Sequence, residues 1–231
     1  MLRRITNFGN GALAVMHPFA RFKRGHLHLT RVEAFSDGVF AIVVTLLVLE
    51  LKLPPLKDHA SVSELAHQLV ELAPKFLSWL ISFIIVCKFW LNHHHVLNLA
   101  HHADYGLAWL NSLFLMGQAF IPFPTAMMGE HPTNPLAVSI FGVVFAVNTL
   151  LFIALQRYIV RNLIKPELAS AQDPRALIKG MVGPASYLIG AAAAWVSVHA
   201  ALVIYLLTPL FYITPPEWHG KVQPGADEKK P

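Results

Sequence analysis

The feature that most constrains this chain is a series of long, mostly apolar stretches. A helix needs about 20 such residues to cross the hydrocarbon core of a bilayer. Six stretches of that kind cover roughly residues 32–53, 74–97, 105–128, 135–160, 177–195 and 198–213. Charged residues make up 13% of the chain, about half of the usual share in a soluble domain. The sequence therefore predicts an all-α, polytopic membrane protein with six transmembrane helices.

Prolines and polar segments mark the ends of the predicted spans. Pro54-Pro55 closes the first span because proline cannot continue the hydrogen-bond ladder of a helix. In the polar segment 57–71 and directly after it, Leu65, Leu69 and Leu72 recur at helical spacing, which predicts a short interfacial helix. The last two spans are nearly continuous. We expect a tight turn between them at residues 197–199, because a single helix of that length would overshoot a bilayer.

The distribution of basic residues predicts the orientation of the chain. Most of its 18 lysines and arginines lie before the first span, between the fourth and fifth spans, or after the sixth. Such residues accumulate on the cytoplasmic side, so both termini are expected there. The basic charge then reflects topology and contact with anionic lipid heads, and it does not predict nucleic-acid binding.

Three regions follow from this pattern. Residues 1–30 form a basic cytoplasmic tail, residues 31–213 the six-helix transmembrane domain, and residues 214–231 a disordered cytoplasmic tail rich in proline, glycine and charge. The first region is not a secretory signal, since Pro18 and the charges that follow it interrupt any apolar core.

Ionisable groups within a span are functional candidates by default. The first span begins with Arg31, Glu33, Ser36 and Asp37. Glu33 can snorkel to the interface, but Asp37 is short and needs a hydrogen-bond donor. We expect that donor to be Arg31 or a polar cluster at the end of the second span. This cluster comprises Lys88, Trp90, Asn92, His93, His94, His95, Asn98, His101 and His102.

The histidines of this cluster do not predict a metal site. Helical metal motifs space histidines three or four residues apart and add an acid or a thiolate, and no pair in the cluster has that spacing. The lone Cys87 also argues against a zinc site built on several thiolates. We expect no cofactor and interpret the cluster as a network whose imidazole and amide groups satisfy Ser36 and Asp37. Protonation of its histidines near about pH 6 would then alter the network.

Beyond Asp37 the first span is almost entirely apolar. Ile42, Thr45, Leu46 and Leu49 recur at i, i+3, i+4 and i+7, so they share one helix face. Small residues beside that face permit close approach of helices. The periodicity leaves open whether this face meets lipid, a neighbouring helix or a pore.

Motifs in three spans together carry a family signature. They are Arg31-x-x-x-Phe35-Ser36-Asp37 with Gly38-Val39-Phe40-Ala41-Ile42 and Thr45-Leu46, then Phe89-Trp90-Leu91-Asn92-His93-His94, then Leu110-Asn111 and Pro122-Phe123-Pro124-Thr125. In this order they resemble the transmembrane protein 175 potassium-channel family over roughly residues 30 to 213. Animal members of the family carry two six-helix repeats and assemble as dimers. This chain carries one repeat, so the resemblance implies a prokaryotic homotetramer in the inner (plasma) membrane.

The resemblance also implies roles for individual residues. In that family the first helices of four subunits line the pore, and Ile42 matches the position of its narrowest ring. Leu46 and Leu49 match further apolar rings, and Thr45 matches a hydroxyl position linked to potassium preference. Ala41 stands where some members have a serine, which implies modest selectivity. Gating and assembly are implied for Arg31, Phe35, Ser36, Asp37, Trp90, His93, His94 and Asn111.

The expected function is therefore passive conduction of potassium and other monovalent cations, with membrane lipids and three further copies as partners. The alternative is a secondary transporter of a small cation or metabolite, which would show internal repeats and a broken helix. An intramembrane enzyme would need a nucleophile with a base, or a metal with an acid, at one depth. No such set is evident, so the chain is not expected to be an enzyme.

Overall fold

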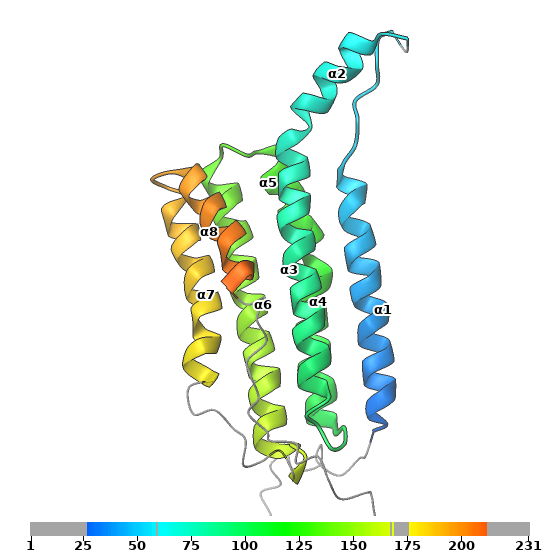
Figure 1. Cartoon of the computed structure of the whole chain (residues 1–231), viewed down its shortest axis with the longest axis vertical. Coiled ribbons are helices and arrows are strands. Elements are labelled where there is room, and N and C mark those ends of the chain that lie inside the picture. The colour runs from blue at the N-terminus through cyan, green and yellow to red at the C-terminus, as the bar shows by residue number, and fades with distance from the viewer. Residues whose placement is uncertain (1–26, 59, 167, 169–175, 212–231) are drawn as a thin grey trace, which may run out of the picture.

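The protein is an all-α bundle in the computed structural model, which describes residues 27–58, 60–166, 168 and 176–211 (Figure 1). Most of the predicted amino-terminal tail and the whole carboxy-terminal tail lie outside these residues. The helices are α1 (Leu29–Leu47), the 3-10 turn η2 (Val48–Glu50), α2 (Val62–Glu71), α3 (Ala73–Leu97), α4 (Tyr105–Phe120), α5 (Pro122–Glu130), α6 (Pro135–Asn162), α7 (Ala176–Ala193) and α8 (Val198–Phe211).

Helices occupy all six of the predicted apolar stretches. Within the described residues, four are long and apolar enough to cross a membrane: α1 with η2, α3, α4 with α5, and α6. Helix α8 is apolar but shorter, and α7 has 18 residues. The structure therefore confirms a polytopic all-α membrane protein.

Three helix boundaries differ from the predicted ones. The first α-helix ends at Leu47 and tightens into η2, which itself ends at Glu50, before Pro54-Pro55. The third predicted span breaks at Ile121, between α4 and α5, where Pro122 lacks the N–H that would continue the ladder. The turn after α7 spans residues 194–197, so it begins earlier than expected.

The predicted short helix after the first span is present as α2, which projects beyond the bundle at the top of Figure 1. The hydroxyl of Ser61 caps it by accepting from the Glu64 N–H. The Glu64 carboxylate accepts from the backbone N–H groups of Lys57 (2.9 Å) and Asp58 (3.1 Å). These two bonds lower the pKa of Glu64 and fasten the preceding loop to the helix.

Aromatic side chains fill the centre of the bundle. Phe114 of α4 packs on Phe89 of α3 and on Phe152 of α6, with ring centroids 5.7 Å and 5.5 Å apart. Phe40 of α1 joins them from the other side, 6.0 Å from Phe114. All four rings are buried, and they join α1, α3, α4 and α6 into one aromatic core.

One end of the bundle gathers the start of α1, the α3–α4 connection and the end of α6. The Leu27 N–H donates to the Ala103 carbonyl, and the His101 N–H donates to the Leu163 carbonyl. The Lys165 N–H donates to the Leu99 carbonyl, 3.0 Å away. The sequence placed these three segments on one side of the membrane, and the structure groups them accordingly.

Close packing of α6, α7 and α8 predicts that Gly142→Ala destabilises the protein. A methyl group at Gly142 would overlap the Tyr205 ring and lie 2.8 Å from the Tyr187 carbonyl oxygen. Overpacking of this kind costs about 1–3 kcal/mol, so thermal unfolding in detergent should begin at a lower temperature. Gly180→Ala is the matched control, because its methyl would lie 3.7 Å from Ile153, an ordinary contact. Equal stability of both variants and the parent would contradict this account of the packing.

Candidate functional site

Helix α1 packs into the bundle along one face only. Phe40, Val43 and Leu47 are buried against the neighbouring helices. On the other face, Ile42 and Leu49 are each 59% exposed and Leu46 is 41% exposed. The residues that periodicity placed on one face thus lie together, and none of the described helices covers them.

Thr45 lies within this exposed face. Its hydroxyl donates to the backbone of the preceding turn, with the Ala41 and Ile42 carbonyl oxygens 3.0 Å and 2.9 Å away. The hydroxyl proton is therefore directed toward the backbone, and the oxygen keeps lone pairs that can face outward. An oxygen so arranged is an acceptor, the kind of group that a cation can approach.

A buried chain of hydrogen bonds ties the amino-terminal half of α1 to two other helices. The Asn111 amide of α4 donates from Nδ2 to the Ser36 hydroxyl, 2.9 Å away. The Asn111 Oδ1 lies 2.7 Å from His93 Nε2 of α3. Since Nδ2 is engaged by Ser36, Oδ1 is the acceptor, and His93 donates through Nε2. Ser36, Asn111 and His93 are all buried.

Asp37 makes its contact on a more exposed side of α1. Its Oδ1 accepts from the indole N–H of Trp90, 2.9 Å away. The ring of His94 lies beside the same indole, with centroids 6.4 Å apart. The expected partners of Asp37 were Arg31 or the imidazole and amide groups of the cluster. The hydrogen bond comes instead from the indole of that cluster.

The polar network predicted from the sequence is therefore present, with different partners. His93 does not contact Ser36 directly. The two are linked by the amide of Asn111, which lies on α4. The His93 imidazole stacks on Phe114, with ring centroids 5.6 Å apart, and its centroid lies 5.5 Å from that of Phe40. These aromatic rings hold the imidazole in place. Phe35 is 61% exposed and lies with Arg31 against a cavity described below.

Two further polar contacts, one on α4 and one on α5, were not predicted from the sequence. Gln118 donates to Asn148 of α6 at 3.0 Å. Ser82 of α3 lies 2.7 Å from the Thr125 hydroxyl of α5. Asn111, Gln118 and Thr125 are seven residues apart and all buried, so they form a polar row along α4 and α5. The seven-residue spacing of polar residues within an apolar span is the sequence pattern that could have predicted this row.

The remaining histidines of the cluster do not assemble a metal site. Within the part of the chain that the structure describes, no three His, Cys, Asp or Glu side chains gather so as to hold a metal ion. His101 and His102 lie beside each other, 5.8 Å apart, without a third ligand of that kind.

Comparisons with known proteins place this arrangement in context. A family model described as the endosomal/lysosomal potassium channel TMEM175 matches residues 31–122. A potassium channel of Chamaesiphon minutus is 34% identical over 79% of this chain and 92% of its own length. A potassium channel of Streptomyces collinus is 33% identical over 79% of this chain and 90% of its own. The crystal structure of a lysosomal potassium-selective channel TMEM175 homolog from Chamaesiphon minutus is 32% identical, covers 80% of this chain and 95% of its own, and superposes with a TM-score of 0.65.

The buried chain from Ser36 to His93 predicts that Asn111→Leu destabilises the bundle. The substitution leaves Ser36 without its donor and His93 without its acceptor, and an orphaned buried group costs about 1–3 kcal/mol. Thermal unfolding in detergent should shift to a lower temperature. Ser112→Ala is the control on the same helix, because that hydroxyl is exposed and bonds only the Ala108 carbonyl. An Asn111→Leu protein as stable as this control would show that the network does not hold α1.

Proposed function

This chain belongs to the TMEM175 family, an ion-channel family and not an enzyme family, and we propose that it is a potassium-permeable cation channel lined by α1 of four identical subunits. The observation that carries the proposal is the uncovered face of α1. Ile42, Leu46 and Leu49 are exposed there, while the opposite face is packed and hydrogen-bonded. Four such faces turned toward one axis would cover one another and leave a narrow passage.

The composition of the exposed face supports a pore over a purely lipid-facing surface. A helix face that meets only lipid tails gains nothing from a hydroxyl or a carboxylate, because lipid tails offer no polar partner. This face carries Thr45 among its aliphatic residues. Asp37 lies nearer the amino end of α1, on a different side of the helix, where it accepts from Trp90 of α3, 2.9 Å away. A cation path gains from the Thr45 hydroxyl, because oxygen atoms can replace part of the hydration shell of an ion.

The aliphatic residues of this face would form a hydrophobic gate. Ile42 and Leu49 are seven residues apart, which is about 10 Å along a helix axis. A narrow apolar segment does not hold a continuous column of water, so it blocks ions until it widens. In this proposal Ile42 forms the narrowest ring, with Leu46 and Leu49 beyond it. The absence of a hydroxyl at Ala41 fits modest selectivity for potassium.

The network on the other face of α1 would set how the gate opens. The Ser36–Asn111–His93 chain is buried and anchors the inner half of α1 to α3 and α4. The Asp37–Trp90 bond is exposed and is thus the contact most easily exchanged for water. We assign Arg31, Phe35 and His94, which lie on the same part of the bundle, to gating and assembly with these residues.

The topology of the full domain belongs to the same proposal. Helices α7 and α8 would complete six spans in residues 31–213, with both termini on the cytoplasmic side of the plasma membrane. The basic residues at one end of the bundle support this orientation.

A secondary transporter is the second candidate. The break between α4 and α5 at Ile121 favours it, because transporters often bind substrate at a discontinuous helix. A channel and a transporter differ in kinetics. Over a range of ion concentration in which transporter flux saturates and requires a counter-ion, channel flux does neither.

Purified protein in liposomes should pass potassium down its gradient without a coupled ion. We expect a flux that rises in proportion to the gradient, with potassium exceeding sodium by a modest factor. Caesium provides a third permeant cation for comparison. A saturating flux that stops when the counter-ion is removed would instead establish the transporter. Empty liposomes and liposomes with heat-inactivated protein are the controls.

The same assay tests the constriction. Ile42→Asn introduces an amide into the narrow segment, so water should enter it more readily and the potassium flux should rise about tenfold or more. Val147→Asn is the matched control, because Val147 is also an exposed aliphatic residue but lies on α6. A flux through Ile42→Asn equal to that of the parent and the control would remove Ile42 from the ion path.

A further inference from the structure

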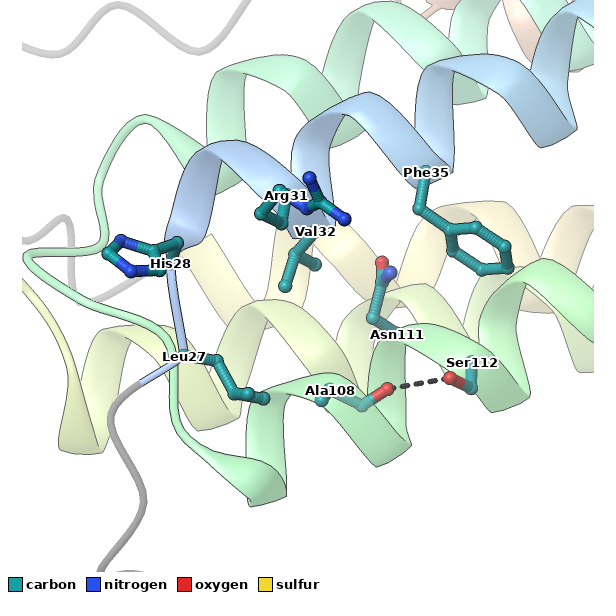
Figure 2. Close-up of a pocket in the computed structure, with 8 residues that line it drawn as sticks. All are labelled: Leu27, His28, Arg31, Val32, Phe35, Ala108, Asn111 and Ser112. Carbon is teal, nitrogen blue, oxygen red and sulfur yellow. Dashed lines mark hydrogen bonds between the residues drawn. The ribbon is translucent and has the colours of Figure 1, made fainter.

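A cavity of about 350 Å³ lies between the first turns of α1 and the start of α4. Val32 points from α1 toward Ala108 on α4, and the Phe35 ring lies over the next turn of α4, near Asn111 and Ser112, as Figure 2 shows. The volume is within the range of about 300–1,000 Å³ that small-molecule sites occupy. The backbone bond from Leu27 to Ala103 holds the start of α1 beside this end of α4, so the walls are fixed by the fold.

The lining of the cavity is divided into a cationic part and an apolar part. Arg31 supplies the cationic group with the His28 imidazole beside it, Val32, Phe35 and Ala108 supply the apolar part, and Asn111 and Ser112 add polar groups. Arg31 and His28 are exposed, and no side-chain cap covers the first N–H groups of α1. The free end of a helix carries partial positive charge, which adds to that of Arg31.

Arg31 forms no salt bridge with an acidic side chain among the residues that the structure describes. Among the described residues, the salt bridges join His67 to Glu71 and Lys75 to Glu130. Neither involves Arg31 or His28. The Asp37 carboxylate, six residues further along α1, accepts from Trp90. Arg31 is therefore available to an anion from outside the chain.

We propose that this cavity binds an anionic phospholipid. Its phosphate lies against Arg31 and His28, and the first part of its acyl chain lies along Val32, Phe35 and Ala108. Guanidinium groups match phosphate oxygens in a two-bond geometry. The cavity lies at the end of a membrane span, which is the depth at which lipid phosphates lie.

The two-part lining favours a lipid over other anions. Free phosphate would leave the apolar wall exposed, whereas one lipid covers both parts. A zwitterionic lipid would bring its own cation close to Arg31, so a net negative headgroup such as phosphatidylglycerol fits better. The inference concerns binding alone and does not depend on conduction by α1.

Native mass spectrometry of the detergent-purified protein tests the proposal. With phosphatidylglycerol added, we expect a retained lipid that phosphatidylcholine does not replace. Arg31→Gln should weaken retention about fivefold, the usual effect of one arginine near anionic headgroups, and Arg31→Lys should restore part of it. Ala108→Phe should abolish retention by filling the cavity while its charges remain. Arg161→Gln is the control, because Arg161 is an exposed arginine near the end of α6, outside this cavity.

Three results would overturn the proposal. The first is equal phosphatidylglycerol retention by the parent, Arg31→Gln and Ala108→Phe. The second is displacement of the lipid by inorganic phosphate at low millimolar concentration, which would show a simple anion site. The third is an intermolecular disulfide through Ser112→Cys in a Cys87→Ala background, which would show that a second copy covers the cavity. Potassium flux in phosphatidylcholine liposomes is scored separately, so failure of lipid binding and failure of the channel proposal remain distinguishable.

Discussion

The structure depends on one row of buried polar side chains along α4 and α5. Apolar surfaces give little drive for helix association in lipid, so interhelical hydrogen bonds and close packing determine which faces meet. Asn111 reaches α1 and α3, Gln118 reaches α6, and Thr125 reaches α3 again. Each bond of this kind contributes on the order of 0.6 kcal/mol in a membrane protein. Their main effect is directional, because each one fixes the rotation of a helix about its own axis.

That directional effect links packing to function through α1. With Ser36 turned toward Asn111, Phe40, Val43 and Leu47 enter the aromatic core. Ile42, Thr45, Leu46 and Leu49 are then left on the outside of the single chain. The pore proposal follows from this rotation, since the same helix turned by half would bury Ile42 and expose Phe40. The lipid proposal concerns the same helix about two to three turns before Ile42, where Arg31 and Phe35 line the cavity between α1 and the start of α4.

Sequence reasoning reached the local features of this protein and missed features that depend on distant contacts. The apolar stretches predicted the helices because a span must satisfy its backbone internally, and periodicity placed Ile42 and Leu46 on one face. The break at Ile121 could have been read from Pro122, but hydropathy over a long window conceals it. The partners of Ser36 and Asp37 were not predictable, because they depend on the rotation of α3 and α4. Trp90 was counted in the cluster for its position, not as the donor to Asp37. The role of Ile42 was implied by family resemblance alone.

The most direct test of the central claim is cadmium block of potassium flux through Ile42→Cys in a Cys87→Ala background. Thiolates bind soft metal ions strongly, and several of them around one axis would hold Cd²⁺ in the ion path. The account predicts that micromolar Cd²⁺ stops the flux through this variant and that a thiol chelator restores it. The Cys87→Ala background and Val147→Cys should remain conducting. An Ile42→Cys protein that conducts equally with and without Cd²⁺ would contradict the account, because Ile42 would then lie away from the path of the ion.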